Sequence, residues 1–502
     1  MKIALTGVTG NMGLQVLNEC LKIPNTRYRL LILPNDKRVK KIRREHKKDL
    51  NRIEIVFGNI ANADVCARLV KDVDYVVHMA AVIPPHSDQH PEQAIECNEV
   101  GADVLATVIE QSDPQPKLIH ISTMALYGNR NEKHLWGRVG DPLLISPFDL
   151  YSLTKMRGEF RILESDVKTK AVIRQTAMLH DNMLSDNMSD GLMFHTCFNA
   201  PLEWSTAETS GLLIANILRQ DIEHDLGDRF WGRVFNLGGG AANCVTGYDI
   251  LNDGFEIIGG SVKNFFEPRF NATRNFHGLW FYDGNALEDM FHYQTQTTVD
   301  FWNKFKSTHG ILKAGKAVPK SWIKRLAIMS LFKSPNSAVY WYKHNDEAKL
   351  LAYFGGKEKY EKLGKKWDEF TLLKFESGYE TLRDKQNAVL PNIGFDPEKE
   401  VTLDTLKRIA ELHGGKLLSD GKQITDRLQW VNSDNETFYA KGTTVLAGHW
   451  YNPSYKSYCW DFDRLAKTDK IYADVWYDSH GKNEDNYYYY DERFEARYEK
   501  IK

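Results

Sequence analysis

The stretch TGVTGNMG, residues 6–13, follows the apolar run KIAL at the N-terminus and opens the helical pattern NMGLQVLNECLKI. It spaces Gly7, Gly10 and Gly13 as GxxGxxG, between a strand-like and a helix-like segment. Glycine permits a tight turn and lets backbone N–H groups approach a pyrophosphate at the positive end of the helix. A lone glycine triplet also fits an ordinary turn, but in this strand–turn–helix setting the pattern predicts dinucleotide binding.

Further apolar runs alternate with helical stretches up to about residue 125. YRLLIL, RIEIVFG, VDYVVHMAA and KLIHIST each end at a polar or glycine-containing loop, and AVIRQTAML and RVFNLGGG continue the series. Strands that alternate with helices pair in parallel and carry helices on both faces. The sequence therefore predicts an α/β fold, a Rossmann-type doubly wound parallel sheet whose ligand crevice lies at the carboxyl ends of the strands.

A chain of 502 residues is too long for one hydrophobic core. We expect an NAD(P)-binding Rossmann domain over 1–310, with a small substrate-binding lobe mainly in 180–300. Residues 311–390 are rich in Lys and aromatic residues and predict a mainly helical connecting region. Residues 391–502 then predict a small additional C-terminal α+β domain.

The formal net charge is −2, from 65 basic and 67 acidic residues, so the chain has no overall field for nucleic acid or an acidic membrane. We expect neither as a partner.

The six cysteines have no paired CxxC spacing, which predicts neither a disulfide framework nor a metal site. No apolar run reaches the ~20 residues of a spanning helix, and the N-terminus leaves no room for a signal peptide, so we expect a cytoplasmic protein.

The choice of dinucleotide depends on the residues after YRLLIL. An acidic residue at this place binds the adenosine ribose of NAD, whereas Arg or Lys accommodates the extra phosphate of NADP. Asp36 is followed by Lys37 and Arg38, within the mainly basic run PNDKRVKKIRREHKK. This run favours NADP over NAD, although a solvated basic helix that touches no ligand also explains its later part.

Several ordered motifs resemble the extended short-chain dehydrogenase/reductases of the NAD-dependent epimerase/dehydratase family. They are TGVTGNMG, VFGNIAN, VDYVVHMAA, CNEVGADVL, HISTMALYG, YSLTKMRGE, VIRQTAML, RVFNLGGG and FYDGNALE, which together cover roughly the first 300 residues. Two positions depart from the family pattern. Asn59 stands where the family has aspartate, and Gln175 stands where it has proline.

The resemblance assigns catalytic roles to four residues. Tyr151 is the acid/base, and Lys155, four residues later on the same helix face, binds the nicotinamide ribose. A phenol with a pKa near 10 must be lowered to act near neutrality, and we expect the Lys155 charge to do this. Thr123 matches the hydroxyl that binds the substrate oxygen, with Ser122 as its neighbour, and Asn98 matches the helix asparagine that supports a proton-relay water. A helix-surface amide explains Asn98 as well.

The glycine turn, the basic run and the resemblance together predict the cofactor-binding residues. These are Gly7, Thr9, Gly10, Asn11, Met12, Gly13, Lys37, Arg38, Asn59, Ile60, Ala80, Ala81, Val82, Ser122, Tyr151, Lys155 and Gln175.

The residues after Thr123 bear on the type of reaction. The family's dehydratases carry an Asp-Glu pair there, whereas this chain has Met124 and Ala125, which cannot shuttle a proton. We therefore expect an NAD(P)-dependent oxidoreductase that reduces or oxidises a carbonyl/alcohol on a small molecule, and no dehydratase. An NAD-dependent sugar-nucleotide epimerase and a non-catalytic dinucleotide-binding sensor or scaffold remain as alternatives.

The C-terminal region exceeds the normal length of the family. The run Tyr487–Tyr490 stands among acidic residues, which repel phosphate, so a structural or self-association role fits it better than nucleic-acid binding. We expect a homo-oligomer.

Overall fold

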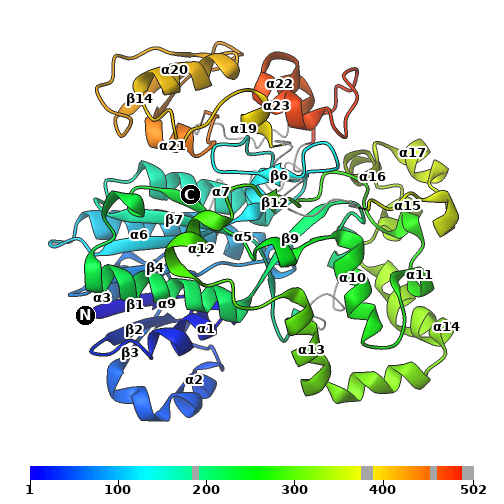
Figure 1. Cartoon of the computed structure of the whole chain (residues 1–502), viewed down its shortest axis with the longest axis horizontal. Coiled ribbons are helices and arrows are strands. Elements are labelled where there is room, and N and C mark those ends of the chain that lie inside the picture. The colour runs from blue at the N-terminus through cyan, green and yellow to red at the C-terminus, as the bar shows by residue number, and fades with distance from the viewer. Residues whose placement is uncertain (184–190, 375–387, 453–460, 489–502) are drawn as a thin grey trace.

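The computed structural model describes residues 1–183, 191–374, 388–452 and 461–488 (Figure 1). Its centre is a seven-stranded sheet in the order β10-β7-β5-β4-β1-β2-β3, and every neighbouring pair is parallel. The strands are β1 (Lys2–Thr6), β2 (Arg27–Ile32), β3 (Ile53–Phe57), β4 (Tyr75–His78), β5 (Lys117–Thr123), β7 (Lys170–Gln175) and β10 (Val234–Leu237). The order reverses direction between β1 and β4, which is where a doubly wound sheet opens its ligand crevice.

Helices cover both faces of the sheet, so the central strands are buried on both sides. The helices of one face are α1 (Asn11–Cys20), α9 (Ala207–His224) and α12 (Asn285–Phe291), with α2 (Val39–Glu45) beside them. Those of the other face are α3 (Ala63–Val70), α6 (Gly101–Glu110) and α7 (Leu150–Glu164). The predicted doubly wound parallel sheet is confirmed.

The lobe beside the carboxyl ends of the strands has its own small sheets. One has the order β11-β9-β8 and another pairs β12 with β6. These strands are β6 (Trp136–Gly137), β8 (Ala177–Leu179), β9 (Pro201–Thr206), β11 (Cys244–Thr246) and β12 (Trp280–Phe281). The helices of the lobe are α10 (Gly247–Glu256), α11 (Val262–Phe265) and α13 (Thr298–Thr308).

The chain after residue 309 continues as a series of short helices, at the right of Figure 1. They are η8 (Gly310–Ala317), α14 (Lys320–Ile323), η9 (Lys324–Ile328), η10 (Met329–Lys333), α15 (Ala338–Lys343), α16 (Glu347–Phe354), α17 (Lys357–Lys362) and η11 (Trp367–Glu369). Their apolar side chains join the cores of the lobe and of the C-terminal region.

The C-terminal region lies over one end of the Rossmann domain, at the top of Figure 1. It combines the sheet β13-β14-β15 with helices. Its elements are β13 (Lys416–Leu417), β14 (Arg427–Val431), β15 (Thr437–Lys441), α19 (Val389–Asn392), α20 (Leu403–Leu412), α21 (Gly442–Leu446), α22 (Phe462–Thr468) and α23 (Lys470–Trp476). Additional C-terminal helices and strands were predicted, and they are present. The domain limits at 310 and 390 stay predictions.

Buried polar contacts join these regions. Arg274 of the lobe donates to the carbonyl oxygens of Leu351 and Ala352, and it pairs with Glu484 at 3.0 Å. The Tyr353 hydroxyl donates to the Pro147 carbonyl oxygen at 2.8 Å. The short helices after residue 309 are therefore fixed both to the lobe and to the loop that precedes α7.

Candidate active site

The glycine turn lies between β1 and α1. Gly7 has a φ of +67°, and a Cβ added there would lie 2.6 Å from the Ala80 nitrogen. A Cβ on Gly13 would lie 2.3 Å from the Gly7 carbonyl oxygen. Both positions therefore require glycine, because any side chain would force apart the turn, α1 and the end of β4. Such a close-packed turn at a helix N-terminus fits a pyrophosphate group.

A large cavity of about 1480 Å³ opens at the carboxyl ends of the sheet strands. Most of the predicted site residues line it, namely Gly7, Thr9, Gly10, Asn11, Met12, Gly13, Arg38, Asn59, Ile60, Ala80, Ala81, Val82, Ser122, Thr123, Tyr151, Lys155 and Gln175. Two predicted residues, Lys37 and Asn98, are not among its lining residues. The cavity exceeds the roughly 300–1,000 Å³ of a typical ligand pocket, so it has room for a dinucleotide and a second molecule.

Tyr151 lies in the first turn of α7, whose N-cap is Asp149. It is hydrogen-bonded to the Thr123 side chain, which comes from the end of β5. Burial raises the pKa of Tyr151 to about 12, and the Asp149 charge adds to the rise, while the Thr123 hydrogen bond opposes it. The phenol therefore holds its proton at neutral pH and can deliver it to a substrate oxygen.

Lys155 stands one helical turn beyond Tyr151. Its Nζ donates to the Ile121 carbonyl oxygen at 2.7 Å, and burial lowers its pKa to about 8. The expected lowering of the Tyr151 pKa by Lys155 is not seen; burial, the Thr123 hydrogen bond and the Asp149 charge shift this pKa, and burial is the largest of the three effects. In this structure Lys155 therefore contacts the strand end, at the cavity wall.

Asn98 is almost fully buried in η2 (Ile95–Val100), a π-helical segment before α6. Its side chain accepts from the Val82 backbone N–H at 2.8 Å and donates to the Val82 carbonyl oxygen at 3.0 Å. It also donates to the Thr154 hydroxyl at 2.9 Å, which ties it to α7. Asn98 thus links the loop after β4 to the helix of Tyr151, and its side chain positions this part of the cavity wall.

The part of the cavity wall that follows β2 in the chain carries one acidic and one basic side chain. Asp36 and Arg38 both line the cavity, and two hydrogen bonds of 2.9 and 2.8 Å join the guanidinium to the carboxylate. Burial alone would raise the pKa of Asp36, but Arg38 and the Thr9 hydroxyl lower it to about 2. The side chain of Asp36 is 9% exposed, so an ionised and nearly buried carboxylate faces this end of the cavity.

The opposite wall comes from residues that the motifs did not indicate. Asp149 and His277 line the cavity, and the His277 Nδ1 lies 3.3 Å from the Asp149 carboxylate. His195 is 8% exposed, and within the described parts of the chain its Nε2 has no hydrogen-bond partner. Lys349 and Tyr353 complete this wall from α16.

The far end of α7 is held by a buried ionic group. Glu159 pairs with Arg174 at 2.6 Å and with the His449 Nε2 at 2.9 Å, and each of the three side chains is fully buried. Burial would raise the pKa of Glu159, but Arg174 and His449 hold it well below its usual range. Arg174 also donates to the Ala447 carbonyl oxygen at 2.7 Å. The C-terminal region therefore contacts the helix that carries Tyr151 and Lys155.

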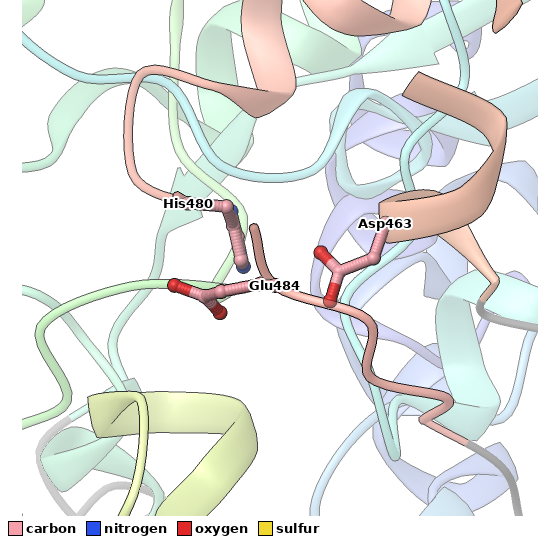
Figure 2. A group of neighbouring side chains, drawn as sticks. All are labelled: Asp463, His480 and Glu484. Carbon is pink, nitrogen blue, oxygen red and sulfur yellow. The ribbon is translucent and has the colours of Figure 1, made fainter. Parts of the chain in front are cut away.

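One group of potential metal ligands occurs among the described residues. It consists of Asp463, His480 and Glu484, whose ligand atoms lie within 4.8 Å of one another (Figure 2). Asp463 accepts from the Trp476 indole N–H at 2.6 Å, and Glu484 accepts two hydrogen bonds from Arg274. A cation here would have to displace these donors, so we assign the group a structural role.

A comparison with protein families finds that residues 3–170 match the NAD dependent epimerase/dehydratase family. An uncharacterized membrane protein of Methanocaldococcus jannaschii is 29% identical over 122 residues, which are 24% of this chain and 35% of that protein. The match thus spans about a third of the length of that relative. Among the described residues of this chain, no helix has the length and apolar character needed to cross a bilayer.

Solved structures with similar chains include enzymes of two reaction types. The dTDP-glucose 4,6-dehydratase of Bacillus anthracis in complex with NAD has 16% identity and a TM-score of 0.48, covering 63% of this chain and 98% of that one. The UDP-glucuronic acid 4-epimerase of Bacillus cereus with UDP-glucuronic acid and NAD has 19% identity and a TM-score of 0.48, covering 62% and 99%.

The matched family is described as containing both epimerases and dehydratases, so the match does not support the predicted exclusion of dehydratase chemistry. The family match covers the glycine turn, Thr123, Tyr151 and Lys155, and it ends before His195, His277, Lys349 and Tyr353 of the opposite wall. Residues 3–170 of this chain thus match the NAD dependent epimerase/dehydratase family, and the match leaves the region after residue 170 uncovered.

Proposed function

We propose that this protein is a nicotinamide-dependent oxidoreductase that interconverts a carbonyl and an alcohol on a small-molecule substrate. The observation that carries the proposal is the hydrogen bond between Thr123 and Tyr151 in a cavity that the glycine turn also lines. A phenol that keeps its proton at neutral pH, beside a second hydroxyl, is suited to protonate a developing alkoxide.

The residues of the chain then have separate tasks. A bound nicotinamide cofactor would supply or accept the hydride. Gly7, Gly10 and Gly13 would hold its pyrophosphate, and Lys155 its nicotinamide ribose. Thr123 would orient the substrate oxygen, and Tyr151 would give its phenolic proton to that oxygen in reduction or take it back in oxidation.

The site also bears on the choice between NADP, which the sequence favoured, and NAD. Lys37 is not a lining residue, and Arg38 is engaged by Asp36. The ionised Asp36 carboxylate would repel a 2′-phosphate and would accept hydrogen bonds from ribose hydroxyls. We therefore propose NAD as the preferred cofactor.

The substrate would lie between Tyr151 and the opposite wall. This wall is lined by His195, by the paired Asp149 and His277, and by Lys349. Lys349 donates to the Pro335 carbonyl oxygen at 3.2 Å and lies over the Trp341 ring at 5.5 Å. Such a set of hydrogen-bonding groups fits a polar substrate rich in oxygen atoms.

The test is to titrate the full chain with NADH and NADPH, following nicotinamide fluorescence, and then to assay carbonyl compounds with the wild type and Tyr151→Phe. We expect Tyr151→Phe to bind cofactor normally and to lose activity by about 10²–10⁴-fold, because general acid catalysis contributes that much. Failure to bind either cofactor would contradict the proposal as a whole.

Other outcomes separate the alternatives. Unchanged turnover in Tyr151→Phe would contradict the mechanism but leave cofactor binding intact. NAD that copurifies and is retained through dialysis would favour the epimerase, which needs no cofactor exchange. Cofactor binding without activity on any carbonyl or sugar-nucleotide substrate would favour the sensor.

A further inference from the structure

The helices after residue 309 expose an unusual row of apolar side chains. Trp322, Leu326 and Met329 are 63%, 71% and 47% exposed, and Val318, just before the helical run, is 40% exposed. Spacings of four and three residues place the first three on one face of the run Lys320–Lys333. Single exposed apolar residues need no explanation, but a continuous row marks a binding surface.

The opposite face of this run is anchored in the protein. Ile328 and Leu331 are buried in the aromatic core of the lobe, with Ile323 and Phe332 packed against it. The Lys320 Nζ donates to the Ile258 carbonyl oxygen at 2.9 Å. The run is therefore a fixed part of the fold at the right-hand edge of the molecule in Figure 1, and its outer face is presented rigidly.

Basic residues surround the row, and acidic residues are missing from this part of the sequence. No Asp or Glu occurs between Asp300 and Asp346, whereas nine cations do, namely Lys304, Lys306, Lys313, Lys316, Lys320, Lys324, Arg325, Lys333 and Lys343. Lys316, Arg325 and Lys333 are exposed next to the apolar row. One acid, Glu267, lies 4.0 Å from Lys324 and pairs with Arg269 at 3.0 Å. The surface is thus locally cationic in a chain whose net charge is only −2.

We propose that this surface, formed by Val318, Trp322, Arg325, Leu326, Met329 and Lys333 and called here the 318–333 surface, docks the protein onto an anionic lipid bilayer. An interfacial helix inserts Trp and Leu side chains at the headgroup boundary, while flanking Lys and Arg contact anionic headgroups. The 318–333 surface combines both features on one exposed face.

The positive charge of the 318–333 surface favours an anionic bilayer over a second copy of the chain as its binding partner. A second copy of the chain would place the same cations against each other, because the same surface would face itself in a twofold dimer. A bilayer that contains acidic lipid instead offers dispersed negative charge that complements all of them. The expectation that no membrane takes part rested on the net charge of the whole chain and on the lack of a spanning run, and neither tests for a local interfacial helix.

The docking surface is continuous with the cavity. Ser334, Pro335 and Asn336 follow directly after Lys333, and all three line the cavity. Adsorption would therefore take place immediately beside the wall that faces Tyr151. The inference does not depend on the proposed reaction, since it concerns the 318–333 surface alone.

The test is co-sedimentation of the full chain with vesicles of phosphatidylcholine and phosphatidylserine, compared with vesicles of phosphatidylcholine alone. We expect sedimentation only with the acidic vesicles, and loss of binding at high salt. The variants Trp322→Ser/Leu326→Ser and Arg325→Glu/Lys333→Glu should each weaken binding by about tenfold or more.

The matched control is Val401→Ser/Leu418→Ser, which alters two exposed apolar side chains of the C-terminal region, 45% and 49% exposed. It should bind as the wild type does. NADH fluorescence and circular dichroism confirm that each variant is folded.

The proposal is overturned if the wild type stays in the supernatant with acidic vesicles, or if Trp322→Ser/Leu326→Ser sediments unchanged. It is also overturned if that variant only converts an oligomer to a smaller species without any effect on vesicles.

Discussion

At the scale of single residues, burial sets the pKa values of the site more than the pairing of Tyr151 with Lys155 does. The spacing YSLTK indicated an electrostatic lowering of the Tyr151 pKa, but burial raises it to about 12. Burial also lowers the Lys155 pKa to about 8. The tyrosine is therefore prepared as a proton donor, which suits reduction better than oxidation.

Asp36 controls the proposed preference for NAD. We expect Asp36→Ala to shift the ratio of NADPH to NADH affinity toward NADPH by about tenfold, because the carboxylate that repels a 2′-phosphate is gone and Arg38 is released. Fluorescence titrations with both cofactors measure this ratio. The control Asp49→Ala removes a carboxylate that pairs with Arg52 and does not line the cavity. A fall in NADPH affinity in Asp36→Ala would contradict the assignment.

His120 predicts how stability depends on pH. It is fully buried on β5, and in the described chain neither ring nitrogen has a hydrogen-bond partner. Burial holds its pKa well below 6.5, with further lowering by Lys155 and His78 against a smaller rise from Glu159. The unfolded chain therefore binds more protons below pH 6.5, and stability falls as the pH falls below that value.

We accordingly expect His120→Leu to raise the midpoint of thermal unfolding at pH 7, since an unpaired buried polar group costs about 1–3 kcal/mol. The loss of stability between pH 7 and pH 5 should also become smaller. Thermal melts at both pH values measure these effects, with the exposed His224→Leu as the control. An unchanged pH dependence would show that His120 does not titrate with unfolding.

At the scale of elements, α7 connects the catalytic residues with the C-terminal region. Tyr151, Lys155 and Glu159 follow one another at intervals of one turn, and Glu159 is paired with Arg174 and His449. Thr444 and the Lys441 backbone N–H also hold Glu164, at 2.5 and 2.7 Å. The position of the catalytic turn thus depends on contacts made at the other end of the same helix.

His449→Ala tests this connection. We expect it to destabilise the protein by about 1–3 kcal/mol, because a buried carboxylate loses one of its donors. Turnover should fall while the exposed control His344→Ala stays normal in both thermal melts and activity. Full activity and stability in His449→Ala would show that Arg174 alone fixes Glu159.

The sequence predicted the features that follow from local residue patterns, and it did not predict those that depend on contacts between residues far apart in the chain. The glycine turn, the parallel strands and the helix of Tyr151 follow from short-range periodicity, and all are present. The wall formed by His195, Lys349 and Tyr353 is not encoded by any local motif, because tertiary folding alone brings 334–353 to the cavity. Likewise, no spacing indicated that Arg38 would be engaged by Asp36. The predicted self-association at Tyr487–Tyr490 falls partly outside the described residues.

At the scale of the whole molecule, the regions on either side of residue 310 share their buried polar groups. Arg274, which is 4% exposed, bonds to Leu351, Ala352 and Glu484. Arg174 and Glu159 likewise depend on residues beyond 440. Removal of the later region would take hydrogen-bond partners from Arg274, Arg174 and Glu159 and would expose the apolar side chains that pack against that region, which is strongly unfavourable.

We therefore expect a fragment of residues 1–310 to be insoluble or unfolded, whereas the full chain folds. Parallel expression, circular dichroism and NADH titration of the two proteins measure the difference. A soluble fragment that binds NADH as the full chain does would show that the Rossmann domain is independent.

The ladder of Tyr151, Lys155 and Glu159 along α7 has a consequence for mutational tolerance. Each residue of an α-helix turns the next side chain by about 100°, so a one-residue deletion between Tyr151 and Glu159 rotates one end of the ladder against the other. Tyr151 and the buried ion pair could then no longer face their partners together. Substitution at an exposed position such as Arg161 leaves the relative rotation of Tyr151 and Glu159 unchanged. The segment between these two residues can therefore vary in composition but not in length.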